Sequence, residues 1–170
     1  MASLRSASIW LKVALATLII AVILFIVAFA TSAWMTHTYR QNYQSIGLWK
    51  YRKCGGSTCN EGRIGYRWGT DFHHATQAME TLGLIALLLS LLILLLYMFV
   101  DSCRRRNALI VTIVFIFVSV FFIVVGIAVC ADKYEERGFS IGWSMGLAIA
   151  AAIFDFVAGV MCVLQLVARV

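Results

Sequence analysis

Long stretches of hydrophobic residues dominate the chain. No Asp, Glu, Lys or Arg occurs in residues 13–33, 81–100 and 108–131, and residues 139–167 contain only Asp155. A helix needs about 20 apolar residues to cross the hydrocarbon core of a bilayer. Inside lipid the backbone must satisfy its own hydrogen bonds, so helices are expected for such runs. The pattern therefore predicts four membrane-spanning helices, at about residues 10–33, 77–100, 108–131 and 140–167.

The longest polar segment, about residues 34–76, separates the first two predicted helices. Residues 36–39 and 45–53 are rich in Thr, Tyr, Ile, Leu and Trp, which favours strands, and residues 64–68 are a third candidate. Tryptophan rings prefer the membrane–water interface. On that ground we expect three tryptophans of this region near the membrane surface: Trp34, Trp49 and Trp68.

A pair of cysteines surrounds the strongest turn signal of this segment. Cys54 and Cys59 flank the sequence Gly-Gly-Ser-Thr, which suits a disulfide across a tight hairpin. Such a bond fixes local shape in a sheet too small to build its own core. The sequence thus predicts an all-α membrane protein, a left-handed up-down bundle of four transmembrane helices. A small disulfide-clamped β-sheet lies between its first two helices, and residues 1–170 form one domain.

The orientation rests on two signals. Four spans place both termini on the same side, together with the Arg104–Arg105–Arg106 cluster in the short link between the second and third spans. The long loop and the link between the third and fourth spans hold more Lys and Arg, so a bare count favours the opposite orientation. Disulfides, however, persist outside the cytosol. We expect a plasma-membrane protein with an extracellular long loop and cytoplasmic termini. An alternative is a signal peptide cleaved near residues 28–30.

Composition narrows the function classes. The chain is 62% hydrophobic and 13% charged, whereas soluble domains are nearer half apolar. The net charge of +6 comes from residues that flank the spans and from the long loop, so nucleic-acid binding is not expected. His37, His73 and His74 lack the spacing of metal ligands, and no catalytic or phosphate-binding motif occurs. We expect no enzyme, no metal and no cofactor.

Several motifs resemble those of one superfamily, which comprises claudins, epithelial membrane proteins, peripheral myelin protein and lens fibre membrane protein. The residues that resemble its W…GLW…C…C signature are Trp34, Gly47, Leu48, Trp49, Cys54 and Cys59. Gln77-Ala78 and residues 138–143 are also similar to the family's entries into the second and fourth spans. The resemblance covers the layout of the whole chain but does not single out a branch. It implies a structural protein of cell–cell contacts that associates with itself in one membrane and across the gap.

The long loop is basic, and five of its residues are predicted to form an extracellular charged face: Lys50, Arg52, Lys53, Arg63 and Arg67. The resemblance implies that charged residues of this loop line paracellular paths, where a positive lining favours anions. The same face would equally dock an acidic ectodomain. The alternative function is therefore an accessory subunit of a channel or receptor. Expected partners are membrane lipids and either copies of this chain or another integral membrane protein.

Two further residues and one small-residue stripe qualify as candidate sites in or beside the spans. Gly142, Gly146 and Ala150 are spaced by four and are predicted to pack helices within the bundle rather than in a dimer. Asp155, without a second buried acid, is expected to bond a Ser, a Thr or the backbone; a transporter using it is a third alternative. Cys103, beside the arginine cluster, is either a palmitoylation site or an inert cysteine.

Overall fold

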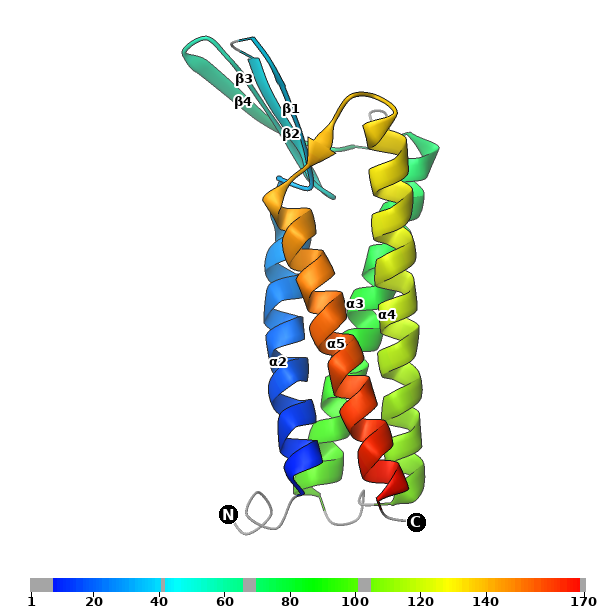
Figure 1. Ribbon diagram of the computed structural model, residues 1–170. Helices are drawn as coiled ribbons and strands as arrows, with labels where there is room; N and C mark the ends of the chain where they lie inside the picture. The colour runs from blue at the N-terminus through cyan, green and yellow to red at the C-terminus, as the bar shows by residue number, and fades with distance from the viewer. Residues whose placement is uncertain (1–7, 41, 66–69, 101–104, 169–170) are drawn as a thin grey trace.

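The computed structural model describes residues 8–40, 42–65, 70–100 and 105–168. Its helices are α2 (Ile9–Ala30), α3 (Asp71–Phe99), α4 (Arg106–Glu135) and α5 (Trp143–Val167). All four are long and apolar enough to cross a membrane. They run up and down, so that the first and the last described residues lie at the end opposite the sheet (Figure 1). The predicted bundle is confirmed.

The inward side of each helix follows steps of mostly three and four residues. In α4 the buried residues are Leu109, Thr112, Ile116, Ser119, Ile123, Gly126, Cys130 and Tyr134. In α5 the repeat runs through Ser144, Ala148, Ala151, Asp155, Ala158, Cys162 and Gln165. A repeat that averages 3.5 residues keeps one seam on the bundle axis. Small and polar residues mark this seam, because in lipid they permit close helix approach and hydrogen bonding.

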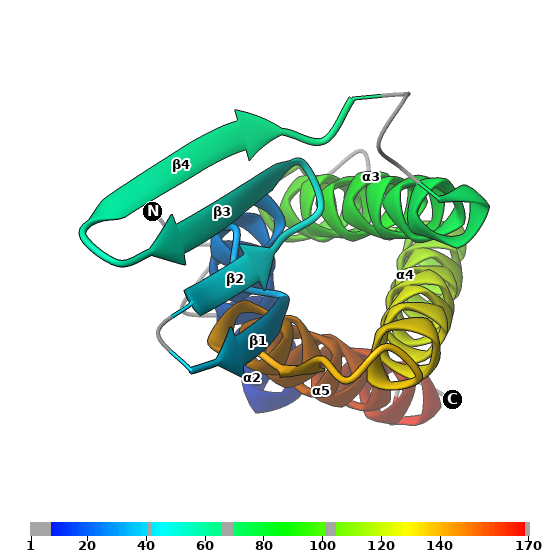
Figure 2. The ribbon, with the colours of Figure 1, turned by 90° about the horizontal axis from the view of Figure 1, so that it is seen from above.

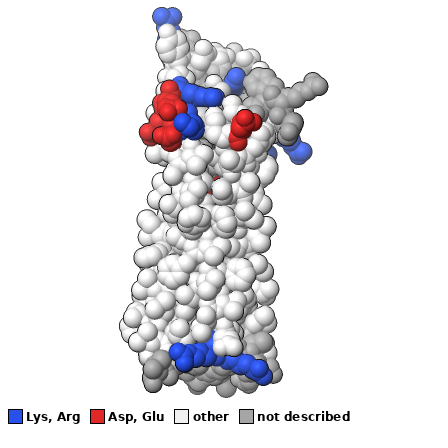
Figure 3. All heavy atoms as spheres, turned by 90° about the vertical axis from the view of Figure 1, so that its right-hand side faces the viewer, with Lys and Arg blue, Asp and Glu red and all other residues white. Residues whose placement is uncertain are grey.

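The helices are arranged as two closely packed pairs, α3 with α4 and α2 with α5. Viewed from above, the four helices surround a common axis, and the strands lie over α2 and extend beyond the bundle on that side (Figure 2). On the face shown in Figure 3, charged side chains gather at the two ends of the bundle. Uncharged surface between two charged ends is what a membrane-spanning body requires.

A five-stranded antiparallel sheet stands on one end of the bundle, in the order β4-β3-β2-β1-β5. Its strands are β1 (Met35–Tyr39), β2 (Asn42–Ile46), β3 (Lys50–Gly55), β4 (Thr58–Arg63) and β5 (Ser140–Ile141). The fifth strand comes from the link between α4 and α5, where the sequence predicted no strand. It pairs with β1 through Met35↔Ile141 and Thr36↔Ser140, so both connections on this side of the bundle join one sheet.

Two predicted strand boundaries are wrong. Residues 45–53 are not one strand, because a turn at Gly47-Leu48-Trp49 separates β2 from β3. Strand β4 ends at Arg63, before the predicted segment 64–68, whose residues 66–68 lie outside the described part of the chain. Strand β4 has the sequence TCNEGR, which is poor in strand-forming residues. Its pairing follows instead from the hairpin turn and the disulfide.

Two helices are longer than the apolar stretches that predicted them. Helix α3 begins at Asp71 rather than near residue 77, and α4 continues to Glu135. Both extensions lie at the sheet end of the bundle, where α4 runs on past residue 131 into Asp132, Lys133, Tyr134 and Glu135. These extra turns provide the polar side chains that hold the base of the sheet.

Candidate functional site

The turn at Gly47-Leu48-Trp49 is the joint between sheet and bundle. The amide of Gly47 donates to the carbonyl of Lys50 at 2.8 Å and closes the turn. A Cβ at Gly47 would lie 2.5 Å from Cα of Ser32, so only glycine lets the turn approach the end of α2. Leu48 is buried, whereas Trp49 is 40% exposed and its ring centroid lies 5.5 Å from that of Phe29.

The carbonyl oxygen of Leu48 is held from two sides by α3. His73 Nε2 donates to it at 3.0 Å and Gln77 Nε2 donates at 2.6 Å. Because a carbonyl only accepts, Nε2 of His73 carries the proton, and its Nδ1 accepts the hydroxyl of Tyr134 at 3.0 Å. This chain of hydrogen bonds connects the turn with α3 and α4, and all of its atoms are buried. The position of the sheet on the bundle is therefore fixed by directional bonds.

Trp34 fixes the other end of the sheet base. Its side chain is 1% exposed, and its indole Nε1 donates to the carbonyl of Ala28 at 2.7 Å. A buried indole whose N–H is hydrogen-bonded acts as a packing anchor of the sheet. Its carbonyl accepts the amide of Gly142 at 2.7 Å, and the neighbouring carbonyl of Ala33 accepts that of Ser144 at 3.1 Å.

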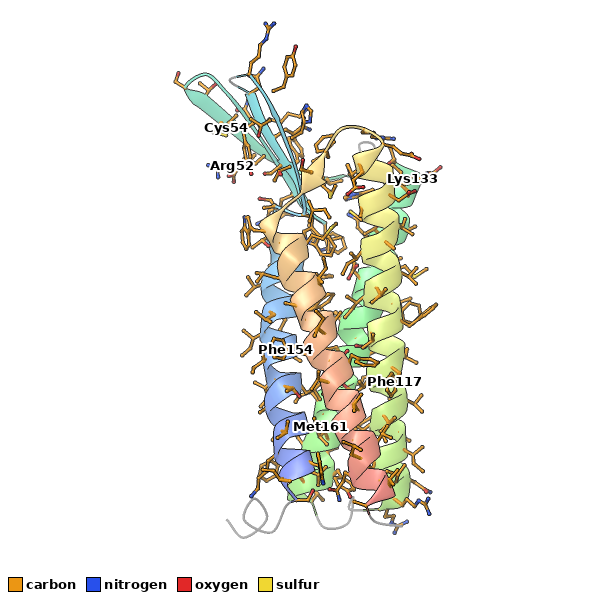
Figure 4. All side chains as sticks on the ribbon, viewed as in Figure 1. Arg52, Cys54, Phe117, Lys133, Phe154 and Met161 are labelled. Atoms are coloured by element: carbon orange, nitrogen blue, oxygen red, sulfur yellow. A yellow bond between two sulfur atoms is a disulfide. The ribbon has the colours of Figure 1, made fainter. Side chains whose placement is uncertain are left out.

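The predicted disulfide between Cys54 and Cys59 is confirmed, with the two Cα atoms 4.0 Å apart. The two residues are directly paired across β3 and β4. Pairing of Gly55 with Thr58 leaves a two-residue loop, whose first residue, Gly56, has φ +59. Glycine adopts that conformation without penalty. Figure 4 places Cys54 and Arg52 on the part of the sheet that extends away from the bundle.

These features occur together in a recognisable family. A model of the PMP-22/EMP/MP20/Claudin family matches residues 7–162. The chain belongs to this family. Its members are structural membrane proteins without enzymatic activity. A comparison with individual curated proteins gave no match.

The six signature residues of this family member share the sheet and its base. Trp34, Gly47 and Leu48 pack the sheet against the helices, while Cys54 and Cys59 close the outer hairpin. These residues therefore act at both ends of the same small sheet, its base and its outer hairpin. His73 and Tyr134, which complete the joint, carried no signal of this role in the sequence.

The basic residues of the sheet do not share one face. Side chains alternate along a strand, and Lys50 pairs with Arg63 while Arg52 pairs with Glu61. These four side chains therefore lie on one face, and Lys53 lies on the other. The predicted single charged face is thus divided, and Arg67 falls outside the described residues.

The face that carries Lys53 turns towards the ends of α3 and α4. A hollow of about 60 Å³ is lined there by Lys53, Gln44 and Tyr51 from the sheet and by His73 and Tyr134 from the helices. On the opposite face Arg52 Nε lies 3.1 Å from Glu61 Oε1, which compensates the charge of this arginine.

The predicted stripe of small residues on α5 does not pack the bundle. Gly146 is exposed, with no atom within 4 Å of the position of a Cβ, and Ala150 is half-buried. Gly142 is the residue before α5, where a Cβ would lie 2.8 Å from the carbonyl carbon of Ala33. A step of four residues advances 400° and so leaves any one face of a helix with 3.6 residues per turn. Of this stripe, only Gly142 has a packing role, and it is towards the sheet.

Asp155 is buried and accepts a hydrogen bond from the hydroxyl of Ser119 in α4. A second buried acid, not expected from the sequence, lies in α3: Glu80 is 0% exposed. Among the residues that the structure describes, neither carboxyl oxygen of Glu80 has a hydrogen-bond partner. Gly126 makes room for it, because a Cβ there would lie 2.9 Å from Cδ of Glu80. Cys103 lies outside the described residues.

An apolar groove of about 490 Å³ runs between α4 and α5. Its walls include Val124 and Ile127 from α4 and Ile149 and Ile153 from α5. Since both helices are membrane spans, this groove opens towards lipid rather than water.

Proposed function

We propose that this protein is a structural component of cell–cell contacts that associates with copies of itself and shapes the passage of ions between cells. It performs no chemical step. One observation carries the proposal: the sheet is bound rigidly to the bundle at its base, yet β3 and β4 project beyond the helices with mostly exposed residues. A rigid, hydrophilic surface held away from the membrane is suited to meeting another molecule.

In this proposal the sheet lies outside the cell and both termini lie in the cytoplasm. The disulfide supports this orientation, because such bonds persist in oxidising compartments. Lys12 in the first turn of α2, together with Arg105 and Arg106 at the start of α4, supports it as well. Basic residues next to spans favour the cytoplasmic side, and these three lie at the end opposite the sheet.

The proposed ion preference is for anions. Lys53, on the sheet face that turns towards the helix ends, presents a positive charge beside the hollow described above. In a narrow passage with low-dielectric walls, fixed positive charge repels cations and raises the local concentration of anions.

Mixed cultures test the proposal. Full-length tagged protein is produced in epithelial cells, and its amount is compared at contacts between two producing cells and at contacts with a non-producing cell. Accumulation only where both cells produce it supports contact through opposing copies. Equal distribution over the whole cell surface contradicts it.

Charge reversal tests the ion preference. Lys53→Glu is expected to shift the dilution potential of a monolayer towards cations. The matched reversal Lys133→Glu, at the sheet end of α4 and paired with Asp132 and Glu136, leaves that potential unchanged. An identical potential in wild-type and Lys53→Glu monolayers contradicts the lining role.

A second candidate function, an accessory subunit of a channel or receptor, is favoured by the groove between α4 and α5. A transmembrane helix of another protein fits an apolar groove in the lipid-facing surface. Substitution of Ile149 and Ile153 by Ala would then release that partner, whereas self-association through the sheet would persist.

A further inference from the structure

We propose that the base of the β3–β4 hairpin binds the phosphate group of a phospholipid in the leaflet on the sheet side of the bundle. The inference rests on the juxtaposition of Lys50, Arg63 and Trp49 around one hollow. It goes beyond the role at cell contacts and does not depend on it.

The first observation is an uncompensated pair of positive charges. Lys50 and Arg63 are direct cross-strand partners in β3 and β4, an arrangement that destabilises an antiparallel pair. The next pair on the same face, Arg52 and Glu61, is an ion pair at 3.1 Å. In the described part of the chain, no carboxylate forms such an ion pair with Lys50 or Arg63. Among the described residues this pair therefore lacks a carboxylate partner, which makes it a favourable place for an anion from outside the protein.

The second observation is a space for that counter-charge. A hollow of about 280 Å³ is lined by Trp49, Lys50, Arg63 and Ile64. The amide of Ile64 donates to the carbonyl of Trp49 at 2.9 Å, so the backbone beneath the hollow is fixed. Both basic side chains are exposed. The lining thus combines two cations with two apolar side chains, which suits an amphipathic ligand better than a free ion.

The third observation is the level of the hollow relative to the membrane. The ring of Trp49 packs on Phe29, which lies in the last turn of the membrane-spanning helix α2. Trp49 is itself 40% exposed, and tryptophan rings prefer the headgroup region. Lys50 follows Trp49 directly and therefore lies at the depth of the lipid phosphates.

The chemistry of the two side chains matches this ligand. The guanidinium of Arg63 presents a planar fork of donors to two phosphate oxygens, and the ammonium of Lys50 adds a point charge. Trp49 and Ile64 offer an apolar wall to the glycerol and upper acyl carbons. Binding would add a lipid contact at the base of the hairpin to the hydrogen bonds that already fix the sheet on the bundle.

Native mass spectrometry of the full-length protein tests this proposal. The protein is purified in an uncharged maltoside detergent and titrated with phosphatidylcholine. The variant K50Q/R63Q is expected to bind this lipid at least about tenfold more weakly, because the loss of a single hydrogen bond to a charged group already weakens binding by about that factor. The control R40Q/K53Q removes the same charge from other parts of the sheet and keeps wild-type affinity. Circular dichroism establishes that both variants are folded.

Two further probes separate phospholipid from other ligands. Diacylglycerol, which lacks the phosphate, is expected to bind equally weakly to wild type and K50Q/R63Q. Inorganic phosphate at millimolar concentration is expected not to displace bound phosphatidylcholine. Equal lipid affinity in wild type and K50Q/R63Q overturns the proposal, as does diacylglycerol binding as tight as that of phosphatidylcholine. Displacement by inorganic phosphate overturns it too, in favour of a site for soluble anions.

Discussion

Replacement of Gly142 by alanine should detach the sheet from the bundle, although the change adds one methyl group. The backbone at Gly142 has φ −89 and ψ 168, values that alanine adopts without strain. The penalty is therefore steric. A Cβ at this position overlaps the carbonyl oxygen of Ala33, lies 2.8 Å from its carbonyl carbon and lies 3.1 Å from the carbonyl oxygen of Trp34.

The size of the destabilisation depends on which atoms must move to make room for the new methyl group. All three atoms belong to the backbone, so no side chain can rotate away, and overpacking of this kind costs about 1–3 kcal/mol. A shift of the two segments also lengthens the hydrogen bonds from Gly142 to Trp34 and from Ser144 to Ala33. Each such bond contributes about 0.5–1.5 kcal/mol. The free energy of unfolding of Gly142→Ala should therefore fall by about 2–6 kcal/mol.

Gly146→Ala is the matched control, since the same methyl group is added one helical turn later. No atom lies within 4 Å of a Cβ at Gly146, and an alanine inside a helix is favoured over glycine by about 0.5–1 kcal/mol. Unfolding by sodium dodecyl sulfate in mixed micelles, followed by circular dichroism, measures both variants. Equal stability of Gly142→Ala and Gly146→Ala would refute the close approach of α5 to the Ala33–Trp34 backbone.

Three further perturbations follow from the same structure. C54S/C59S should accelerate trypsin cleavage within the β3–β4 hairpin but leave the unfolding midpoint of the bundle unchanged, because so short a disulfide loop contributes only about 2 kcal/mol and does so locally. His73→Ala should destabilise by about 1–3 kcal/mol, since it leaves a buried tyrosine hydroxyl unpaired, and Tyr134→Phe should destabilise by a similar amount in the same assay, because it leaves Nδ1 of His73 without a donor. Ser119→Ala should destabilise by a similar 1–3 kcal/mol, because it removes the donor to a buried carboxyl in α5; a wild-type unfolding midpoint would show that this bond is not needed.

The helices and the hairpin could be predicted from the sequence because each depends on local features. Charge-free runs such as 108–131 specify spans by length alone. The Gly-Gly turn between Cys54 and Cys59 specifies its own disulfide, since neighbours in a hairpin meet wherever the hairpin is placed. The family signature was equally local, being confined to one segment between two spans.

Which side of each helix faces the bundle axis could not be predicted from the pattern of hydrophobic residues. In lipid both the inward and the outward residues are apolar, so the usual amphipathic contrast is absent. The stripe at Gly142, Gly146 and Ala150 was chosen by a spacing of four, which drifts around the helix. The alternating spacing through Ser144, Ala148 and Ala151 was the better signal, because small and polar residues stay on the axis only with that repeat.

Contacts between segments far apart in the chain could not be predicted from the sequence either. The bond of His73 to Leu48, the addition of β5 to β1 and the burial of Glu80 against α4 join segments that are far apart in the chain. Adjacent histidines and a short link between spans gave no indication of their partners. To predict that the basic residues are divided between two sheet faces, one needs the register of β3 and β4, which is set by the turn.

The central claim is that this chain associates with copies of itself, and its recovery from native membranes tests that claim most directly. Tagged full-length protein is extracted in a mild detergent, separated by native electrophoresis and identified by mass spectrometry. The account predicts a ladder of multiples of the 18.9 kDa chain with no other protein in stoichiometric amount. Recovery of a single copy bound to one unrelated channel or receptor would contradict it and would make this protein an accessory subunit.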